Sequence, residues 1–336
     1  MKRVLLTGAT TPIGRRLVRR LLEDPGVEQV LAVGIEPGRP DEAPGRYRYE
    51  RVDLTRERHV RRLMFGSVRE LEVDTIVDMA THRQPEQSRR AHLLNVEATR
   101  HLLRFAERVP SVRRYVYRSY SEVYARTNDL PALLDEFHPL RMGPKTPAWI
   151  LDRVEADLAV CARMGMSEVS IAVLRCAECL APEMGSQLYD YVQPRVCFRP
   201  MGYDPMVNVI SEEDLVEALS RAARSEAEGV FTIPGLEAMP LSAIIARWGR
   251  RDVPVPGPLM RPLYTARRAT VGGEFHYPTS RGLLHFGGVL DGTRARAVLG
   301  YEPRTPVHWP VSLAEVGRRA RAESGRSLRR WIAGDD

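Results

Sequence analysis

The segment that most constrains the fold of this chain is residues 4–14, where a short apolar run leads through a glycine turn into a helix. The run at 4–6 predicts a buried parallel strand. A helical pattern begins near Pro12, and Gly14 would let that helix approach the strand closely. Backbone N–H groups and the positive end of the dipole at a helix N-terminus favour a bound anion. The segment therefore predicts a pyrophosphate site, although a purely structural βα turn fits the same residues.

Strand and helix patterns alternate through the first two thirds of the chain, which predicts a parallel sheet covered by helices. We expect further strands at residues 29–35, 47–52, 73–79, 112–118 and 171–175, and helices at 85–108 and from 147 onward.

The second strand ends at Glu36, about 20 residues after Gly14. An acidic residue at this spacing binds the adenosine ribose hydroxyls of a dinucleotide and repels a 2′-phosphate. We therefore expect NAD as the cofactor rather than NADP. Two alternatives stay open: Arg39 would favour the phosphorylated nucleotide, and Glu36 would have no ligand if it lay in a plain surface turn.

Five short motifs along the chain share their order and spacing with one family. They are Thr7-Gly8 to Gly14, Asp53-Leu54, Ala80-Thr81-His82, Asn95-Val96, and Ser119-Tyr120-Ser121-Glu122-Val123-Tyr124-Ala125. Together they resemble the extended short-chain dehydrogenase/reductase family, of the NAD-dependent epimerase/dehydratase type. The likeness continues to Leu299-Gly300-Tyr301-Glu302-Pro303, and Thr11 stands where the family has its middle glycine.

The resemblance implies an α/β fold, with a doubly wound parallel Rossmann sheet and a smaller, mixed C-terminal substrate domain. The expected dinucleotide-binding domain is residues 1–175 with a returning segment at about 205–235, and the substrate-side domain is 176–204 and 236–336. By the same resemblance, the cofactor is held by Gly8, Thr10, Thr11, Ile13, Gly14, Glu36, Asp53, Leu54, Met79, Ala80, Thr81 and Asn95. It also implies a homodimer through the helices at about 85–108 and 147–164.

The family's catalytic tyrosine and lysine, four residues apart on one helix, are missing. The chain has only Lys2 and Lys145, and no tyrosine has a lysine four residues after it. In an ungapped register Ala148 and Asp152 occupy the two positions, whereas a shift by one residue places Trp149 and Arg153 there. The family's substrate-binding serine or threonine is replaced by Tyr120.

Two interpretations of the altered site follow. In the first, Tyr120 is a relocated general acid/base, next to Ser119, and Arg153 supplies positive charge. An arginine lowers the pKa of a neighbouring tyrosine but cannot itself carry protons. In the second, which the residues favour, Tyr120 only packs and the chain is a non-catalytic, dinucleotide-binding regulatory or scaffold protein. Glu178 replaces an asparagine that contacts substrate in the family's nucleotide-sugar epimerases, so a UDP-sugar is a less favoured substrate.

The composition limits the kinds of molecule that the chain is expected to bind. The chain has 336 residues, 43% of them hydrophobic, and a net charge of +7 carried mostly by arginine. The arginine runs fit solvated helix faces, and without interleaved aromatic residues they predict no nucleic-acid binding. No apolar run approaches the ~20 residues needed to span a bilayer, and no secretory leader precedes the first strand. These features predict a cytoplasmic protein.

Two further sequence features give only weak evidence of a function. Cys176 and Cys179 have a metal-ligand spacing but no matching second pair, so buried structural cysteines are expected and no metal. Residues 312–332 have a basic amphipathic helix pattern with a sparse apolar face. A solvated terminal helix is expected there, with binding to a membrane surface as the alternative and no stable membrane insertion.

Overall fold

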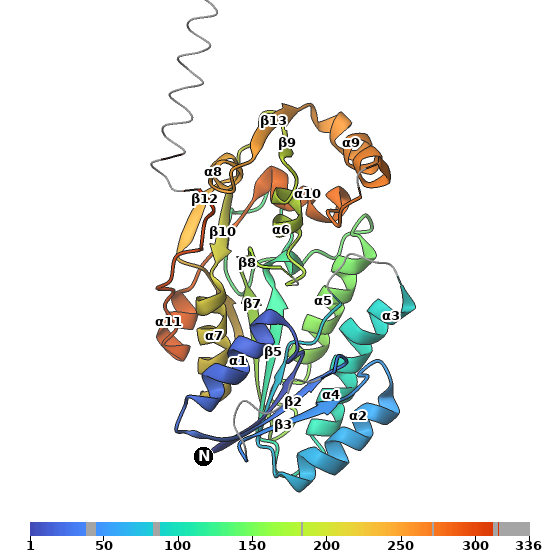
Figure 1. Cartoon of the computed structure of the whole chain (residues 1–336), viewed down its shortest axis with the longest axis vertical. Coiled ribbons are helices and arrows are strands. Elements are labelled where there is room, and N and C mark those ends of the chain that lie inside the picture. Colours follow the sequence, from blue (N-terminus) through green and yellow to red (C-terminus); the bar gives the residue numbers. More distant parts are fainter. Residues whose placement is uncertain (38–44, 83–87, 183, 271, 312–314, 316–336) are drawn as a thin grey trace, which may run out of the picture.

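The computed structural model describes residues 1–37, 45–82, 88–182, 184–270, 272–311 and 315, and its main element is a seven-stranded parallel sheet (Figure 1). The strands run in the order β11-β7-β5-β4-β1-β2-β3. Their bounds are β1 Lys2–Thr7, β2 Val27–Gly34, β3 Tyr47–Arg51, β4 Thr75–Asp78, β5 Arg114–Tyr120, β7 Ser170–Cys176 and β11 Gly229–Ile233. The strand order reverses between β1 and β4, as in a doubly wound sheet. The predicted fold class is confirmed.

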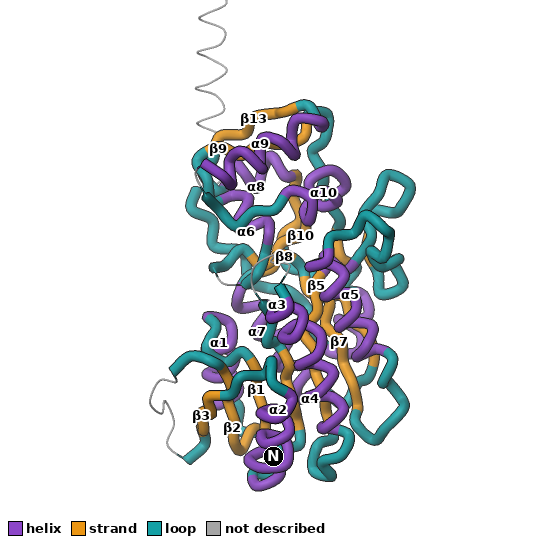
Figure 2. The backbone as a smooth tube through the Cα atoms, turned by 90° about the vertical axis from the view of Figure 1, so that its right-hand side faces the viewer, coloured by secondary structure: helices purple, strands orange, loops and turns teal. Residues whose placement is uncertain are grey.

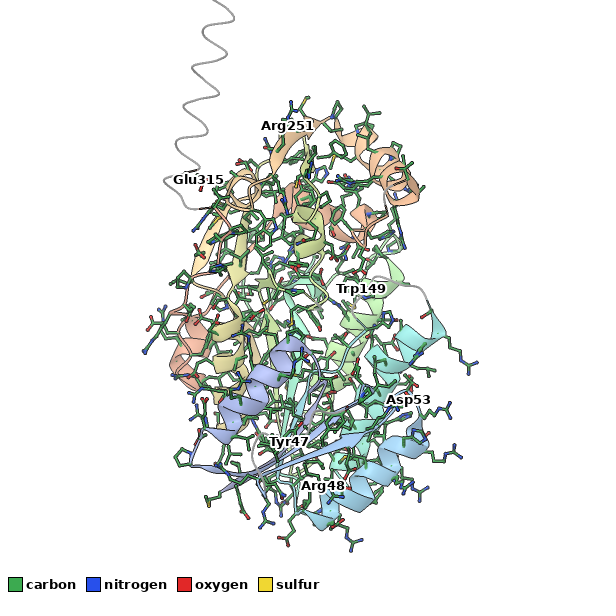
Figure 3. All side chains as sticks on the ribbon, viewed as in Figure 1. Tyr47, Arg48, Asp53, Trp149, Arg251 and Glu315 are labelled. Atoms are coloured by element: carbon green, nitrogen blue, oxygen red, sulfur yellow. The ribbon has the colours of Figure 1, made fainter. Side chains whose placement is uncertain are left out.

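Helices cover both faces of this sheet (Figures 1 and 2). One face carries α1 (Pro12–Leu22), α7 (Glu212–Arg224) and α11 (Thr293–Leu299), and the other carries α2 (Glu57–Leu63), α4 (Ala98–Ala106) and α5 (Ala148–Cys161). Because both faces are covered, the inner strands are mostly buried, as is typical of parallel sheets. Strand β3 at the edge, where Tyr47 and Arg48 are labelled in Figure 3, is half-buried and polar, and β5 carries two buried arginines, Arg114 and Arg118.

Two predicted elements differ from the observed ones. The helix expected at 85–108 begins with α3 (Arg89–His92), widens into one π-helical turn, η2 (Leu93–Glu97), and continues as α4. A π-helical turn inside a helix is frequent at functional sites, and here it contains Asn95. Strand β5 runs two residues beyond its predicted end, which places Tyr120 inside the strand.

A smaller mixed α/β part stands above the carboxyl ends of the strands (Figure 1). It contains β8 (Glu178–Cys179), β10 (Met206–Ile210) and β12 (Glu237–Pro240) in one small sheet, and β9 (Val196–Pro200) with β13 (Arg251–Val255) in another. Helices α6 (Gln187–Val192), α8 (Leu241–Arg247), α9 (Gly257–Thr270) and α10 (Tyr277–Phe286) pack on these strands. This part has a hydrophobic core of its own, built from residues such as Leu188, Tyr191 and Ile244. Short strands β6 (Leu133–Leu134) and β14 (Val289–Leu290) connect it to the rest.

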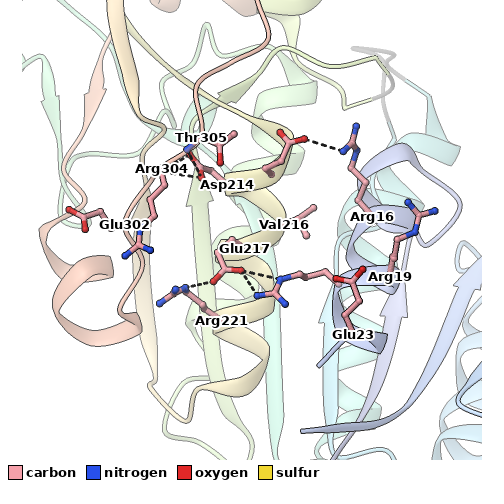
Figure 4. A pocket seen from close by; sticks show the side chains of 12 residues that line it. Arg16, Arg19, Glu23, Asp214, Val216, Glu217, Arg221, Glu302, Arg304 and Thr305 are labelled. Carbon is pink, nitrogen blue, oxygen red and sulfur yellow. Dashed lines mark hydrogen bonds and ion pairs between the residues drawn. The ribbon is translucent and has the colours of Figure 1, made fainter. Parts of the chain in front are cut away.

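Ion pairs tie α1 to α7 at one edge of the molecule (Figure 4). Glu217 accepts hydrogen bonds from both Arg20 and Arg221, at 3.0 and 2.6 Å. The Asp214 carboxylate accepts the backbone N–H groups of residues 304–305 at 3.1 to 3.2 Å. Arginines on these helix faces thus pair with carboxylates and fasten the C-terminal segment to the sheet.

No helix in the described part of the chain is both long and apolar enough to cross a membrane. The basic segment at 312–332, for which we predict a terminal helix, lies outside the described residues apart from Glu315.

A buried hydroxyl joins the two strands at which the sheet order reverses. Thr7 Oγ1, at the end of β1, donates to Asp78 Oδ1 on β4 at 2.7 Å. It also accepts the backbone N–H groups of Met79 and Ala80, both at 3.0 Å. Burial raises the pKa of Asp78, although the hydroxyls of Tyr115, Thr7 and Thr99 oppose this by hydrogen bonding to the carboxylate.

We predict that Thr7→Val lowers the free energy of unfolding by about 2 kcal/mol or more, because it leaves the buried Met79 N–H and part of a carboxylate unsatisfied and removes one acceptor of the half-buried Ala80 N–H. Thr99→Val is the matched control: its hydroxyl makes only one bond to Asp78, of 3.0 Å, so its cost is about 1 kcal/mol. Urea denaturation measures both, and equal losses would contradict the bridging role of Thr7.

Candidate cofactor and active site

The turn between β1 and α1 requires glycine at two positions. Gly8 has a φ of +67°, a conformation that other residues rarely adopt. A Cβ on Gly14 would lie 2.3 Å from the Gly8 carbonyl oxygen, so any side chain there would push α1 away from β1. The two predicted glycines therefore set the close approach of helix and strand.

Thr11, which stands at the family's middle glycine, is part of the turn. Its Oγ1 accepts the Gly14 N–H at 2.9 Å and donates to the Gly8 carbonyl at 2.9 Å. The side chain thus caps α1. The backbone N–H groups of Thr10 and Ile13 make no hydrogen bond within the described residues. The Thr10 amide lines the cleft at the positive end of α1 and is available to an anion, whereas Ile13 is fully buried.

A cleft of about 580 Å³ opens beside this turn, at the carboxyl ends of β1, β2 and β4. Eight of the predicted cofactor residues line it: Gly8, Thr10, Thr11, Glu36, Asp53, Leu54, Ala80 and Thr81. The other four, Ile13, Gly14, Met79 and Asn95, are buried behind the lining. Several lining residues were not among the predicted cofactor residues, including Gly34, Thr55, His82 and Arg90. His82 ends the Ala80-Thr81-His82 motif, and the other three lie a few positions from the predicted motifs and carry no pattern of their own.

Glu36 is fixed at the end of β2. Thr10 Oγ1 donates to its carboxylate, and the Tyr49 hydroxyl donates to its backbone carbonyl. Burial and the nearby Glu36 charge raise the pKa of Tyr49, so this phenol stays protonated and keeps donating. Arg39, the competing residue for nucleotide choice, lies outside the described residues.

Asp53 is a half-buried carboxylate on the cleft wall. Burial raises its pKa, but the Thr55 hydroxyl and N–H, at 2.6 and 3.1 Å, together with Arg90 and Arg56, hold the pKa below its usual value. The residue is therefore ionised at neutral pH and can accept a hydrogen bond from a ligand.

Asn95 supports the opposite wall from behind. Its Oδ1 accepts the His82 backbone N–H at 2.7 Å and the Thr81 hydroxyl at 3.0 Å. The π-helical turn that contains Asn95 gives its side chain access to the chain segment after β4. The resemblance implies this supporting role, and the contacts fit it.

At the end of β5 the aromatic ring of Tyr120 lies between two guanidinium groups. The guanidinium carbon of Arg118 is 4.7 Å from the ring centroid and that of Arg153 is 3.7 Å away. Arg153 also lies 3.6 Å from the Trp149 ring centroid. We call these four buried side chains the Tyr120 stack.

The position of the stack shows which of the two possible registers places residues of α5 next to Tyr120. Trp149 and Arg153 point inward to Tyr120, whereas Ala148 is exposed. Asp152 is directed to α3, where its carboxylate lies 2.9 Å from His92 Nδ1. The register shifted by one residue is therefore the one that faces the site.

Arg153 is anchored on both sides. It forms an ion pair with Glu122 and donates to the Gly185 carbonyl at 3.2 Å. Burial lowers its pKa to about 10, which leaves it charged at neutral pH.

Ser119, the residue predicted to act together with Tyr120, forms a hydrogen bond outside the Tyr120 stack. Its hydroxyl donates to Asp157 at 2.5 Å, and Asp157 forms a buried bidentate pair with Arg175, at 2.7 and 3.1 Å. Burial would lower the pKa of Arg175, but its hydrogen bonds to Asp157 and the charge of that carboxylate raise the pKa above its usual value. The structure therefore separates Ser119 from the Tyr120 stack. Asp157 was missed by the sequence analysis because it looks like one more polar residue of a helix.

A second cleft, of about 1080 Å³, lies between the loops after β5 and helices α9 and α10. Its described lining contains five cationic side chains and no carboxylate: Arg126, Arg141, Lys145, Arg261 and Arg281. Burial and the charges of Arg126 and Arg281 lower the pKa of Arg141 to about 10. Arg126 connects this cleft to the residue after Tyr120, since it donates to the Ser121 hydroxyl at 3.0 Å.

The cysteines form no disulfide in the described chain. Cys176 and Cys179 are buried, and burial raises the pKa of both thiols to about 12. They are therefore protonated and behave as apolar side chains.

Comparison with known proteins identifies the family. Residues 4–196 match the model of the "NAD dependent epimerase/dehydratase family", and the chain belongs to that family. It is 32% identical over 310 residues to uncharacterised proteins of Mycobacterium bovis and Mycobacterium tuberculosis, covering 90% of this chain and 80% of each relative. The predicted family is confirmed, and the family supports NAD as the cofactor.

Solved structures share the fold at low identity. A dTDP-glucose 4,6-dehydratase of Streptomyces venezuelae, with NAD bound, matches with a TM-score of 0.66 and 20% identity over 98% of both chains. A UDP-glucose 4-epimerase of Thermotoga maritima matches with a TM-score of 0.66 and 13% identity, over 90% of this chain and 94% of the other. MoeE5, in complex with UDP-glucuronic acid and NAD, matches with a TM-score of 0.63 and 20% identity, over 90% and 94%.

We predict that Gly14→Ala abolishes the stabilisation of the protein by NAD⁺, because the new Cβ would displace α1 from the turn. The control is Gly66→Ala, where nothing lies within 4 Å of the added Cβ. Thermal unfolding with and without NAD⁺ is the measurement. An unchanged NAD⁺-induced rise in Tm for Gly14→Ala would contradict the assigned role of the turn.

Proposed function

We propose that this protein is an NAD-dependent oxidoreductase of the epimerase/dehydratase type with an altered active site, in which Tyr120 takes the place of the family's catalytic tyrosine. The observation that supports the proposal is the arrangement of the two sites. The cleft beside the glycine turn is lined by the residues that bind a dinucleotide in the family, and the Tyr120 stack lies on β5, next to β4 in the sheet.

The residues in the cleft fit NAD. The free amide of Thr10 suits the pyrophosphate, the Glu36 carboxylate suits the ribose hydroxyls, and the ionised Asp53 suits the adenine amino group. Gly8 and Gly14 keep the turn clear of side-chain atoms. A carboxylate at position 36 would repel the 2′-phosphate of NADP.

Bound NAD supplies a hydride acceptor, and the chain must then move a proton at the substrate oxygen. In this proposal the Tyr120 hydroxyl moves it. The two flanking cations, Arg118 and Arg153, face the ring of Tyr120 and supply positive charge beside it. They cannot act as the proton carrier, because guanidinium groups keep their protons at neutral pH. Arg153 thus takes over the charge of the family's lysine but not any part in proton transfer.

A second candidate is a non-catalytic dinucleotide-binding protein with a regulatory or scaffold role. Ser119 favours it, since its hydroxyl is bound to Asp157 and is not free to hold a substrate oxygen. In that case Tyr120 has only a packing role.

The expected assembly is a homodimer through α4 and α5. Leu151 and Leu158 support it: they are seven residues apart on α5, so they share a face, and both are exposed. The domain boundaries given by the sequence and a cytoplasmic location stay predictions.

The test is reduction of bound NAD⁺, followed by absorbance, with nucleotide sugars, sugar acids and sugar phosphates as substrates. We predict that Tyr120→Phe lowers kcat by about 10²–10⁴-fold, the usual contribution of general acid–base catalysis. Tyr189→Phe is the control, because this tyrosine packs on Trp248 away from the stack. Unchanged turnover in Tyr120→Phe would remove Tyr120 from the mechanism, and NAD⁺ binding without turnover of any substrate would favour the second candidate.

A further inference from the structure

The Tyr120 stack contains four buried polar atoms that have no partner in the described part of the chain. They are the hydroxyl of Tyr120, the indole Nε1 of Trp149, and the Nε atoms of Arg118 and Arg153. The three nitrogen atoms can only donate hydrogen bonds, and the phenol hydroxyl can either donate or accept. Buried polar groups in native proteins nearly always have partners, so a concentration of donors points to an acceptor that the chain itself does not supply.

Arg118 is the member of the stack with the clearest lack of a partner. It is 5% exposed, and among the described residues its side chain makes no hydrogen bond or ion pair, while its guanidinium faces the Tyr120 ring. Arg114 lies on the same strand, four positions earlier, and is 2% exposed. It donates to the Ala222 and Ala227 carbonyls and to the Ser170 hydroxyl, at 3.0, 2.6 and 2.9 Å. The side chain of Arg114 thus makes three hydrogen bonds, although its Nη2 has no partner among the described residues, whereas no hydrogen bond is found for the side chain of Arg118.

The charges around the stack also leave Arg118 uncompensated. Glu122 pairs with Arg153. The Glu178 carboxylate accepts from the Ser121 and Ser186 hydroxyls, at 3.3 and 2.9 Å. No described carboxylate forms an ion pair with Arg118, and a buried cation without a counter-charge is costly. Water could accept the hydrogen bonds but would not neutralise the charge.

We propose that the Tyr120 stack binds an anionic group of the ligand, a carboxylate or a phosphate, through Arg118. Such a group accepts hydrogen bonds only and matches the planar, forked guanidinium. The neighbouring cleft also favours an anionic group, because its described lining contains five cationic side chains and no carboxylate. This inference rests on the proposed function, because it names the class of ligand for the same site. If the protein is an enzyme, that ligand is its substrate.

The first arm of the test needs only the natural chain. Thermal unfolding of NAD⁺-loaded protein is measured with D-glucuronate, D-glucose 6-phosphate and uncharged D-glucose, at constant ionic strength set with chloride. We expect a saturable rise in Tm with at least one anion and none with D-glucose. The two anions distinguish a carboxylate from a phosphate site.

The second arm compares Arg118→Met with the matched variant Arg114→Met. We expect Arg118→Met to lose the anion-dependent rise in Tm and, without anion, to unfold at or above the temperature of the natural chain. Arg114→Met should unfold at a lower temperature, because its three acceptors lose their donor, and should keep the anion-dependent rise.

Three results would overturn the proposal. They are no rise with either anion, an equal rise in Arg118→Met, and a loss of folding in Arg118→Met as large as in Arg114→Met. NAD⁺ binding is measured on the same samples. If NAD⁺ does not bind, that result counts against the proposed function. Whether the anion-induced rise in Tm depends on Arg118 is a separate result, and it tests only the anion site.

Discussion

The hydroxyl of Thr7 is the contact on which the site depends, because it joins the ends of β1 and β4 where the strand order reverses. It bonds the Asp78 carboxylate and two backbone N–H groups at once. The chain leaves these two strands in different directions, into the glycine turn and into the segment at 79–82. Ligands of open α/β sheets bind in the crevice at this reversal, and the cleft lined by Gly8, Asp53 and Ala80 lies there.

The active site that we propose keeps a positive charge but has a different chemistry from that of the family. Where the family has a tyrosine and a lysine, α5 presents Trp149 and Arg153, and the guanidinium lies between two aromatic rings. A guanidinium holds its proton, so it can orient and stabilise an anion but cannot pass a proton on. The only phenol in the stack is on β5 instead of α5. Any proton transfer at this site therefore depends on Tyr120, and the excess charge on Arg118 makes an anion the natural ligand.

Local patterns explain how much of this structure could be predicted from the sequence. The strands, the glycine turn and the positions of Glu36 and Asp53 follow from apolar runs and from residues a short distance away in the chain. The side of α5 that faces the site could not be predicted, since a shift of one residue turns a helix by about 100° and neither register restores the family's pair. The sequence analysis also overlooked Arg118 and Asp157. Charged residues within a strand or a helix have no signal of burial, and their partners are far away in the sequence.

The central claim is that the glycine turn, with threonine at its middle position, still forms an NAD site. Calorimetric titration of the natural chain, stripped of nucleotide, with NAD⁺ and NADP⁺ tests it most directly. We predict one NAD⁺ bound per chain with a micromolar Kd, and NADP⁺ weaker by about tenfold or more, ~1.4 kcal/mol, because the Glu36 carboxylate would repel a 2′-phosphate. No binding of either nucleotide would contradict the claim, and tighter binding of NADP⁺ would overturn the assignment of Glu36.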